Sequence, residues 1–260
     1  MSEFNSIKFD VTDRVATISL DRPDAAHGIN LEMGRELSEV ALICERDPDI
    51  RAVVLTSSGK LFCGGGDIVE ISGFNDTGVK MKTLVDSLHR AMISFANMSS
   101  PLIVAVNGTA AGAGFSLVLS GDYVVSVESA KFTMAYTKIG LSPDGGASYH
   151  LPRIVGARRA YELIATNRVL TAQEAQEWGI VNQLVAADEL QGVAMQVAAG
   201  LAAGSKDSNG AVKQLLKASL GNSLEQQLEM ESRLISDNAR GEDGREGVRA
   251  FLEKRPPQYK

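Results

Sequence analysis

Glycine is the residue whose distribution first suggests chemistry in this chain. The 260 residues include 25 glycines, and two groups of them lie in residues 62–67 (FCGGGD) and 111–114 (AGAG). Backbone N–H groups of a glycine-rich turn, above all at the start of a helix, can converge on an anion. Neither segment matches the phosphate loop or the full dinucleotide fingerprint. Tight turns and close packing would explain one such segment, but two favour an oxyanion hole whose donors come from separate loops.

A carboxylate and an imidazole are further candidates. Asp144 lies in the turn sequence SPDGG, just before a helical pattern, so it could cap that helix or take and give a proton. His89 lies in a helical pattern that is apolar on one face, where a histidine is more often structural or exposed. Local sequence alone predicts that Tyr136 and the Cys63 thiol are ordinary packing residues. We keep His89 and Tyr136 as candidate catalytic or pocket residues.

Composition excludes several classes of protein. Two cysteines cannot build a disulfide framework or a four-cysteine zinc site, and the three histidines fit no metal-ligand spacing, so we expect no metal. A net charge of −6 argues against nucleic-acid binding. The sequence has no signal-like N-terminus and no apolar stretch near the ~20 residues of a membrane helix. We therefore expect a cytoplasmic globular protein with no membrane partner.

The elements that must position these residues follow a repeated plan. Apolar or alternating segments at residues 15–20, 51–56, 102–106 and 122–127 predict strands, and the spacing over residues 31–46 predicts a helix. Strand, turn, glycine cluster and helix start recur at a spacing of roughly 50 residues. This order predicts an α/β fold of stacked ββα turns rather than a dinucleotide-binding sheet.

The last part of the chain is helical. Capping boxes begin at Thr171 and Ser223, and a short strand is predicted at residues 180–185. We expect a core over residues 1–197 and a helical oligomerisation region over residues 198–260. Such a region packs on the core or on a neighbouring subunit.

Five segments together resemble the enoyl-CoA hydratase/isomerase (crotonase) superfamily, and the resemblance extends over roughly residues 8–255. The resemblance implies a crotonase-like spiral of ββα repeats with a C-terminal trimerisation region, hence a homotrimer or a dimer of trimers. It also implies an acyl-CoA thioester substrate, with coenzyme A entering as part of the substrate and no separate cofactor. The segments are residues 62–67, 101–114 (PLIVAVNGTAAGAG), 132–146 (FTMAYTKIGLSPDGG), 170–175 (LTAQEA) and 178–181 (WGIV).

The same resemblance assigns residues to the binding of the thioester. The oxyanion hole of the family maps onto the N–H groups of Gly66 and Ala113. Residues 22–29 match the stretch that contacts coenzyme A, although His27-Gly28 departs from the usual pattern there. The expected coenzyme A contacts are Arg22, Ala26, His27, Gly64, Asp67 and Ile68.

Family membership alone does not determine the reaction. The enoyl-CoA hydratases that this sequence resembles use two glutamates, and their positions are occupied here by Ser116 and Tyr136. Neither residue can hold a water between paired carboxylates, as addition across a double bond requires. Hydration by the usual mechanism is therefore disfavoured.

The remaining acid, Asp144, has the context of the Δ3-Δ2-enoyl-CoA isomerases and of the ring-opening isomerase of phenylacetate degradation. One base suffices to isomerise a double bond, so we predict an isomerase that uses Asp144. Asp144 and His89 also fall at the nucleophile and histidine positions of 4-chlorobenzoyl-CoA dehalogenases, where Tyr136 replaces a tryptophan. A dehalogenase-like or thioesterase-like enzyme is thus an alternative, as is a non-catalytic acyl-CoA-binding homologue.

Overall fold

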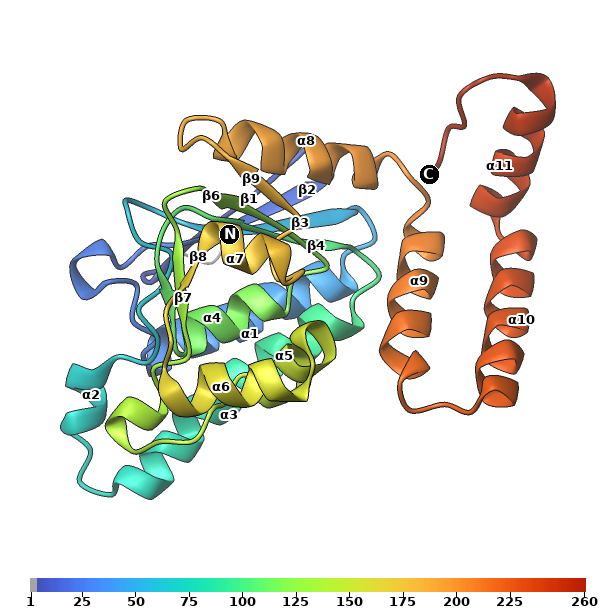
Figure 1. Ribbon diagram of the computed structural model, residues 1–260. Coiled ribbons are helices and arrows are strands. Elements are labelled where there is room, and N and C mark those ends of the chain that lie inside the picture. The colour runs from blue at the N-terminus through green and yellow to red at the C-terminus, as the bar shows by residue number, and fades with distance from the viewer. Residues whose placement is uncertain (1–3) are drawn as a thin grey trace.

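The core is built on a six-stranded sheet, seen at the centre of Figure 1. The computed structural model describes residues 4–260. The strand order is β1-β2-β3-β4-β6-β9, with β1 antiparallel to β2 and the other neighbours parallel. The strands are β1 (Ile7–Thr12), β2 (Val15–Leu20), β3 (Ala52–Ser57), β4 (Leu102–Val106), β6 (Tyr123–Val127) and β9 (Gln183–Val185).

A second, small sheet brings the glycine-rich loops together. It consists of β5 (Ala110–Ala111), β7 (Lys131–Thr133) and β8 (Leu170–Thr171), in the order β5-β7-β8. Isolated bridges join Cys63 to Ala110 and Ile29 to Gly66, both in parallel orientation. Successive turns of the spiral therefore lie side by side at the positions where each strand gives way to a loop.

Helices cover both faces of the large sheet. Figure 1 shows α8 (Leu190–Ala202) on one side and α1 (Leu31–Arg46), α3 (Thr77–Asn97) and α4 (Ala113–Leu119) on the other. The central strands β3 and β4 are buried along their whole length, which explains their almost continuous apolar sequence. The remaining helices of the core are α2 (Ile68–Ser72), α5 (Ala147–Val155), α6 (Ala157–Thr166) and α7 (Ala172–Glu177).

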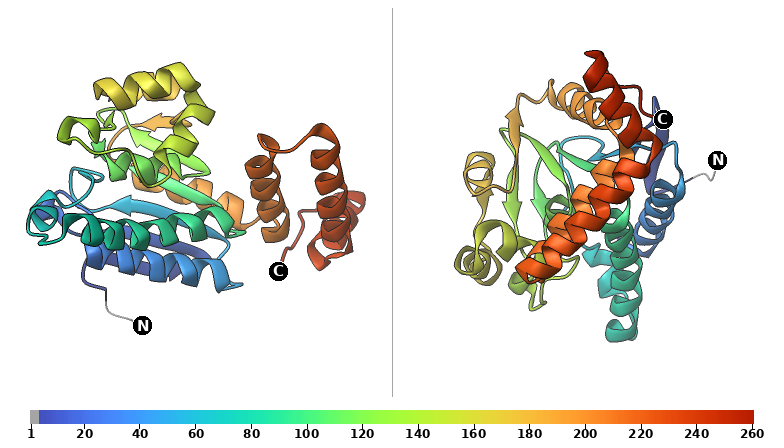
Figure 2. Two further views of the ribbon diagram at one scale, coloured as in Figure 1. Left: turned by 90° about the horizontal axis from the view of Figure 1, so that it is seen from below. Right: turned by 90° about the vertical axis from the view of Figure 1, so that its right-hand side faces the viewer.

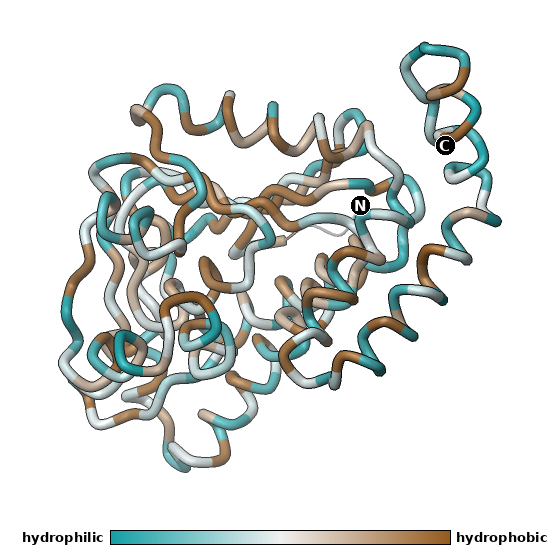
Figure 3. The backbone as a smooth tube through the Cα atoms, turned by 45° about the vertical axis from the view of Figure 1, so that its right-hand side comes forward, coloured by the Kyte–Doolittle hydropathy of each residue, from teal (hydrophilic) through white to brown (hydrophobic). Residues whose placement is uncertain are grey.

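Three helices form a C-terminal arm over residues 206–260, which stands away from the core in Figures 1 and 2. They are α9 (Lys206–Ser219), α10 (Leu224–Arg240) and α11 (Glu242–Glu253). Because α8 continues on the sheet past residue 197 to Ala202, the change from core to arm falls between α8 and α9. None of the residues of α10 is buried, and apolar segments recur along the arm in Figure 3.

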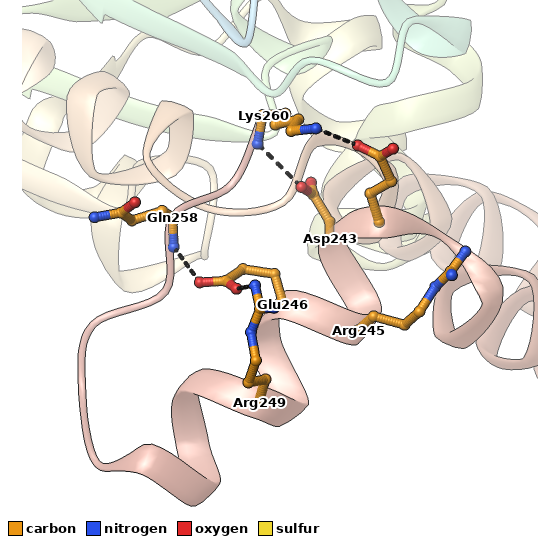
Figure 4. A pocket seen from close by; sticks show the side chains of 7 residues that line it. Asp243, Arg245, Glu246, Arg249, Gln258 and Lys260 are labelled. Atoms are coloured by element: carbon orange, nitrogen blue, oxygen red, sulfur yellow. Dashed lines mark hydrogen bonds and ion pairs between the residues drawn. The ribbon is translucent and has the colours of Figure 1, made fainter.

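The arm is held against the core by partly buried polar contacts. Lys213 on α9 donates to the carbonyls of Phe95 and Ser100 and pairs with Asp122 at 2.7 Å. The chain end also folds back, as Figure 4 shows, so that Lys260 N donates to the Asp243 carboxylate.

The structure confirms the predicted mixed α/β fold and its helical C-terminal region. The capping boxes at Thr171 and Ser223 are both formed. Within residues 4–260, no helix combines the length and the apolar character needed to cross a membrane.

Candidate active site

The two glycine-rich loops are in direct contact. Ala111 N donates to Cys63 O at 2.9 Å, and Gly112 N continues the small sheet by donating to Thr133 O at 3.0 Å. Gly65 has a φ of +105°, and a Cβ atom there would lie 3.1 Å from Ala111 O. A side chain at this position would therefore strain the backbone and separate the loops.

Each loop presents a backbone donor at this junction. Ala113 is the first residue of α4, so its N–H has no acceptor within the helix. Gly66 forms a parallel bridge with Ile29. The hydrogen bonds of this bridge run from Ile29 N to Gly65 O and from Asp67 N to Ile29 O, so the Gly66 N–H takes no part in them. Among the residues that the structure describes, neither N–H has a protein acceptor. The structure thus brings together the loops that carry the two predicted donors, and unpartnered backbone N–H groups can bind an anion or a polarised carbonyl oxygen.

A network of polar contacts holds the neighbouring loop, which precedes α1. Arg22 pairs with Asp67 at 2.8 Å and also donates to the carbonyl of Gly28. Asp67 accepts from the N–H groups of Val69 and Glu70 and so caps α2. Burial opposes ionisation of Asp67, but these hydrogen bonds and Arg22 lower the pKa of its carboxyl below the ordinary value. The Arg22 and Asp67 side chains therefore position the loop.

His27 occupies the same loop with its imidazole inside the protein. Its side chain is 1% exposed, its φ is +51°, and Nδ1 accepts from Arg22 N at 3.0 Å. With Nδ1 as acceptor, Nε2 carries the proton and donates to Ser58 O at 2.8 Å. Burial lowers the pKa of His27, which favours this neutral form. Both ring nitrogens are therefore occupied by protein partners, which leaves no polar side-chain atom of His27 for a ligand.

The other expected coenzyme A contacts lie around this loop at its surface. Gly64 is exposed and donates its N–H to Ala26 O at 2.9 Å, which joins the two predicted segments. Ile68, in the first turn of α2, is 52% exposed. Cys63 is fully buried behind the loop, and burial raises the pKa of its thiol to about 12, as expected for a packing residue.

Asp144 does not cap a helix, so that interpretation of its sequence context is wrong. The N-cap of α5 is Gly146, and no side chain caps this helix. The Asp144 carboxylate instead accepts a hydrogen bond from the Tyr136 hydroxyl at 2.5 Å. The side chain is half-buried, so it combines a fixed orientation with access from outside.

Tyr136 and Ser116 form a hydrogen-bonded chain that ends at Asp144. The Ser116 hydroxyl lies 2.9 Å from the Tyr136 hydroxyl and 3.0 Å from the Asp144 carbonyl oxygen. Burial, together with the charge of Asp144, raises the pKa of Tyr136 well above its ordinary value, so the phenol stays protonated. Tyr136 is buried with the core, as a packing residue is, and its hydroxyl in addition contacts Ser116 and Asp144. The sequence does single out both residues, as occupants of the two glutamate positions, but not their contact.

His89 lies on α3 beside the loop that carries Asp144. Its Nε2 accepts a hydrogen bond from Gly145 N at 3.0 Å, so the ring supports the residue that follows the acid. A groove of about 800 Å3 adjoins His89 and Gly146 and extends between α3, α5 and α9, with mainly apolar walls. Within the described residues, no group of three or more His, Cys, Asp or Glu side chains is placed to hold a metal ion.

Residues 10–260 match the protein-family model described as enoyl-CoA hydratase/isomerase. The chain is 40% identical over 250 residues to a 1,2-epoxyphenylacetyl-CoA isomerase of Escherichia coli (strain K12), covering 94% of both chains. It is 36% identical over 257 residues to a probable enoyl-CoA hydratase of Rhodobacter capsulatus, covering 98% of both. A crystal structure of an enoyl-CoA hydratase from Polaromonas sp. JS666 superposes with a TM-score of 0.93 at 33% identity, covering 98% of this chain and 100% of that one.

Proposed function

Because the chain belongs to the enoyl-CoA hydratase/isomerase family, we propose that it shifts a double bond in an enoyl-CoA thioester, with Asp144 as its acid/base. One observation carries this proposal. Ser116, one helical turn after Ala113 on α4, bonds to the backbone of Asp144 and to the Tyr136 hydroxyl that holds the carboxylate. A single short helix therefore connects an unpartnered backbone donor to the candidate base.

The proposed reaction needs one base and two backbone donors. The N–H groups of Gly66 and Ala113 donate hydrogen bonds to the thioester oxygen, and the Asp144 carboxylate removes a proton from the carbon between the thioester and the double bond. The electron pair moves onto the thioester oxygen as an enolate, which the two donors stabilise; losing one such donor typically costs ~3 kcal/mol. Protonated Asp144 then returns the proton to the other end of the allylic system, and the carboxylate is regenerated.

The site favours isomerisation over hydration. Relatives with both kinds of name align along nearly the whole chain, so the choice depends on the residues of the site. The two positions that carry glutamates in hydratases hold Ser116 and Tyr136, which bond to each other and to Asp144. A single carboxylate held in place by a hydroxyl suits a reaction in which one base removes a proton and then returns it.

The dehalogenase-like or thioesterase-like alternative requires His89 to activate water. Its Nε2 lone pair accepts from Gly145 N, which removes that atom from water activation in this arrangement. The acyl-CoA-binding alternative needs no base, whereas Asp144 is held half-buried with its carboxylate oriented. These two observations support the proposal of isomerisation over both alternatives.

A panel of 3-enoyl-, 2-enoyl- and aryl-CoA thioesters tests the proposal, with products identified by mass and ultraviolet spectrum. Conversion of a 3-enoyl-CoA to its 2-enoyl isomer, without change of mass, supports it. Addition of water, release of halide or release of free coenzyme A as the main reaction contradicts it.

We also propose that the arm makes the protein a trimer or a dimer of trimers. The 17-residue helix α10 has no buried side chain. It exposes Leu224, Leu228 and Ile235, which form an apolar surface that a second copy of the chain can cover. Sedimentation velocity should give three or six times the chain mass of 27.7 kDa, and a monomer would contradict the proposal.

A further inference from the structure

We infer that Tyr136 is a positioning residue for the proposed reaction: its hydroxyl keeps the Asp144 carboxylate oriented, and Ser116 fixes that hydroxyl. This inference rests on the proposed role of Asp144 as the base. It assigns a task to the two side chains that occupy the glutamate positions of hydratases.

The number of protons determines the direction of the hydrogen bond. Tyr136 has one hydroxyl proton, and an ionised Asp144 can only accept, so the phenol proton lies on the 2.5 Å contact. The Ser116 proton then has three acceptors within reach: the phenol oxygen at 2.9 Å, Asp144 O at 3.0 Å and Gly112 O at 3.4 Å. Ser116 thus links the first turn of α4 to the phenol and to the loop of the acid.

Burial makes the contact strong and specific. Ser116 is 0% exposed and Tyr136 is 8% exposed, so little water can replace either hydroxyl. In the described part of the chain, Tyr136 is the one side chain that donates to the Asp144 carboxylate. Without the phenol proton, the carboxylate would lose this one side-chain donor and with it its orientation.

Two ionisable groups approach Asp144, and they act differently. Tyr136, just before the short 3-10 helix Thr137–Ile139, contacts the carboxylate itself. His89, from α3, contacts the backbone of Gly145 and not the carboxylate. The orientation of the Asp144 carboxylate should therefore depend on Tyr136 much more than on His89.

Steady-state kinetics of Tyr136→Phe tests the inference, with the exposed Tyr161→Phe as a matched control. The substrate is the 3-enoyl-CoA that the native protein isomerises. For Tyr136→Phe we expect kcat to fall by roughly tenfold to a hundredfold at similar KM. The control should match the native protein in both kcat and KM.

The outcomes separate the inference from the function on which it rests. Native kcat for Tyr136→Phe contradicts the inference, as does a lower kcat accompanied by an equal rise in KM, because that pattern indicates a structural role alone. If Tyr136→Phe does not fold, Ser116→Ala decides: a lower kcat at native KM supports the inference, and native kcat contradicts it. Asp144→Asn is run alongside, and native turnover by that variant contradicts the proposed function itself.

Discussion

The imidazole of His89 and the backbone of Gly145 are joined by a hydrogen bond of 3.0 Å, with the Gly145 N–H as donor and Nε2 as acceptor. Nε2 therefore presents its lone pair to the loop of Asp144 and not to a water molecule. A reaction that forms an ester on Asp144 would need a base to activate water for its hydrolysis. A proton shuttle on Asp144 needs only that the loop is held in place.

This contact predicts a mild effect for His89→Gln. The amide oxygen of glutamine can accept from Gly145 N, so we expect isomerase turnover within a few-fold of the native value. Incubation with an aryl-CoA followed by mass spectrometry of the peptide containing Asp144 should show no adduct. An acyl or aryl mass trapped on that peptide would support the dehalogenase-like alternative.

Hydration of crotonyl-CoA should be very slow. Addition of water needs a second carboxylate to hold it, and Ser116 and Tyr136 are bonded to each other at that place. The loss of the 2-enoyl absorbance measures hydration directly. Turnover near the ~10 per second of a typical enzyme would show that another residue supplies the missing carboxylate.

The N–H of Ala113 can be removed with little change to its helix. Ala113 is the first residue of α4, where proline is well tolerated, so Ala113→Pro should fold. We expect this variant to lose turnover by about 10²–10³-fold, because it lacks one oxyanion donor. Ala113→Gly keeps the N–H and should be mild. Thermal unfolding controls for folding, and a folded proline variant with native turnover would exclude Ala113 from the site.

The local sequence predicts the helices and strands of this fold better than it predicts the contacts between them. β2, α1 and β4 coincide with their predicted residues, because alternation, helical spacing and buried apolar runs are local signals. The hydrogen bond between Tyr136 and Asp144 joins residues eight positions apart across a 3-10 turn, which no periodicity indicates. The SPDGG turn favours an N-cap, but the helix begins two residues later, after Gly146. The placement of the arm depends on contacts such as those of Lys213 with the carbonyls of Phe95 and Ser100, which join residues far apart in the sequence.

His27 should make the stability of the protein sensitive to acid. Burial lowers its pKa below the ordinary value of 6.5, so the unfolded chain binds the proton more readily than the folded one. The stabilisation by neutral His27 is therefore present above pH 6.5 and is lost as the pH falls through the lower pKa of the folded state.

Thermal unfolding of the native protein and of His27→Asn across pH 5–8 measures this contribution, and asparagine tolerates the φ of +51°. The native protein should be more stable at pH 8, and the difference should shrink toward pH 5. The pKa of His150 is also lowered by burial, but His150 is present in both proteins, so its contribution to the difference in stability cancels. A difference that does not change with pH would show that His27 does not titrate as the structure indicates.

The rate of isomerisation by the native protein, compared with that by Asp144→Asn, tests the central role of Asp144 most directly. Each protein is incubated in deuterated water with a 3-enoyl-CoA, and deuterium in the recovered thioester and formation of the 2-enoyl isomer are both followed. We expect the native protein to isomerise the substrate, and Asp144→Asn to do so about 10²–10⁴-fold more slowly while it still binds coenzyme A thioesters. Equal isomerisation by the two proteins would contradict the role of Asp144 as the base.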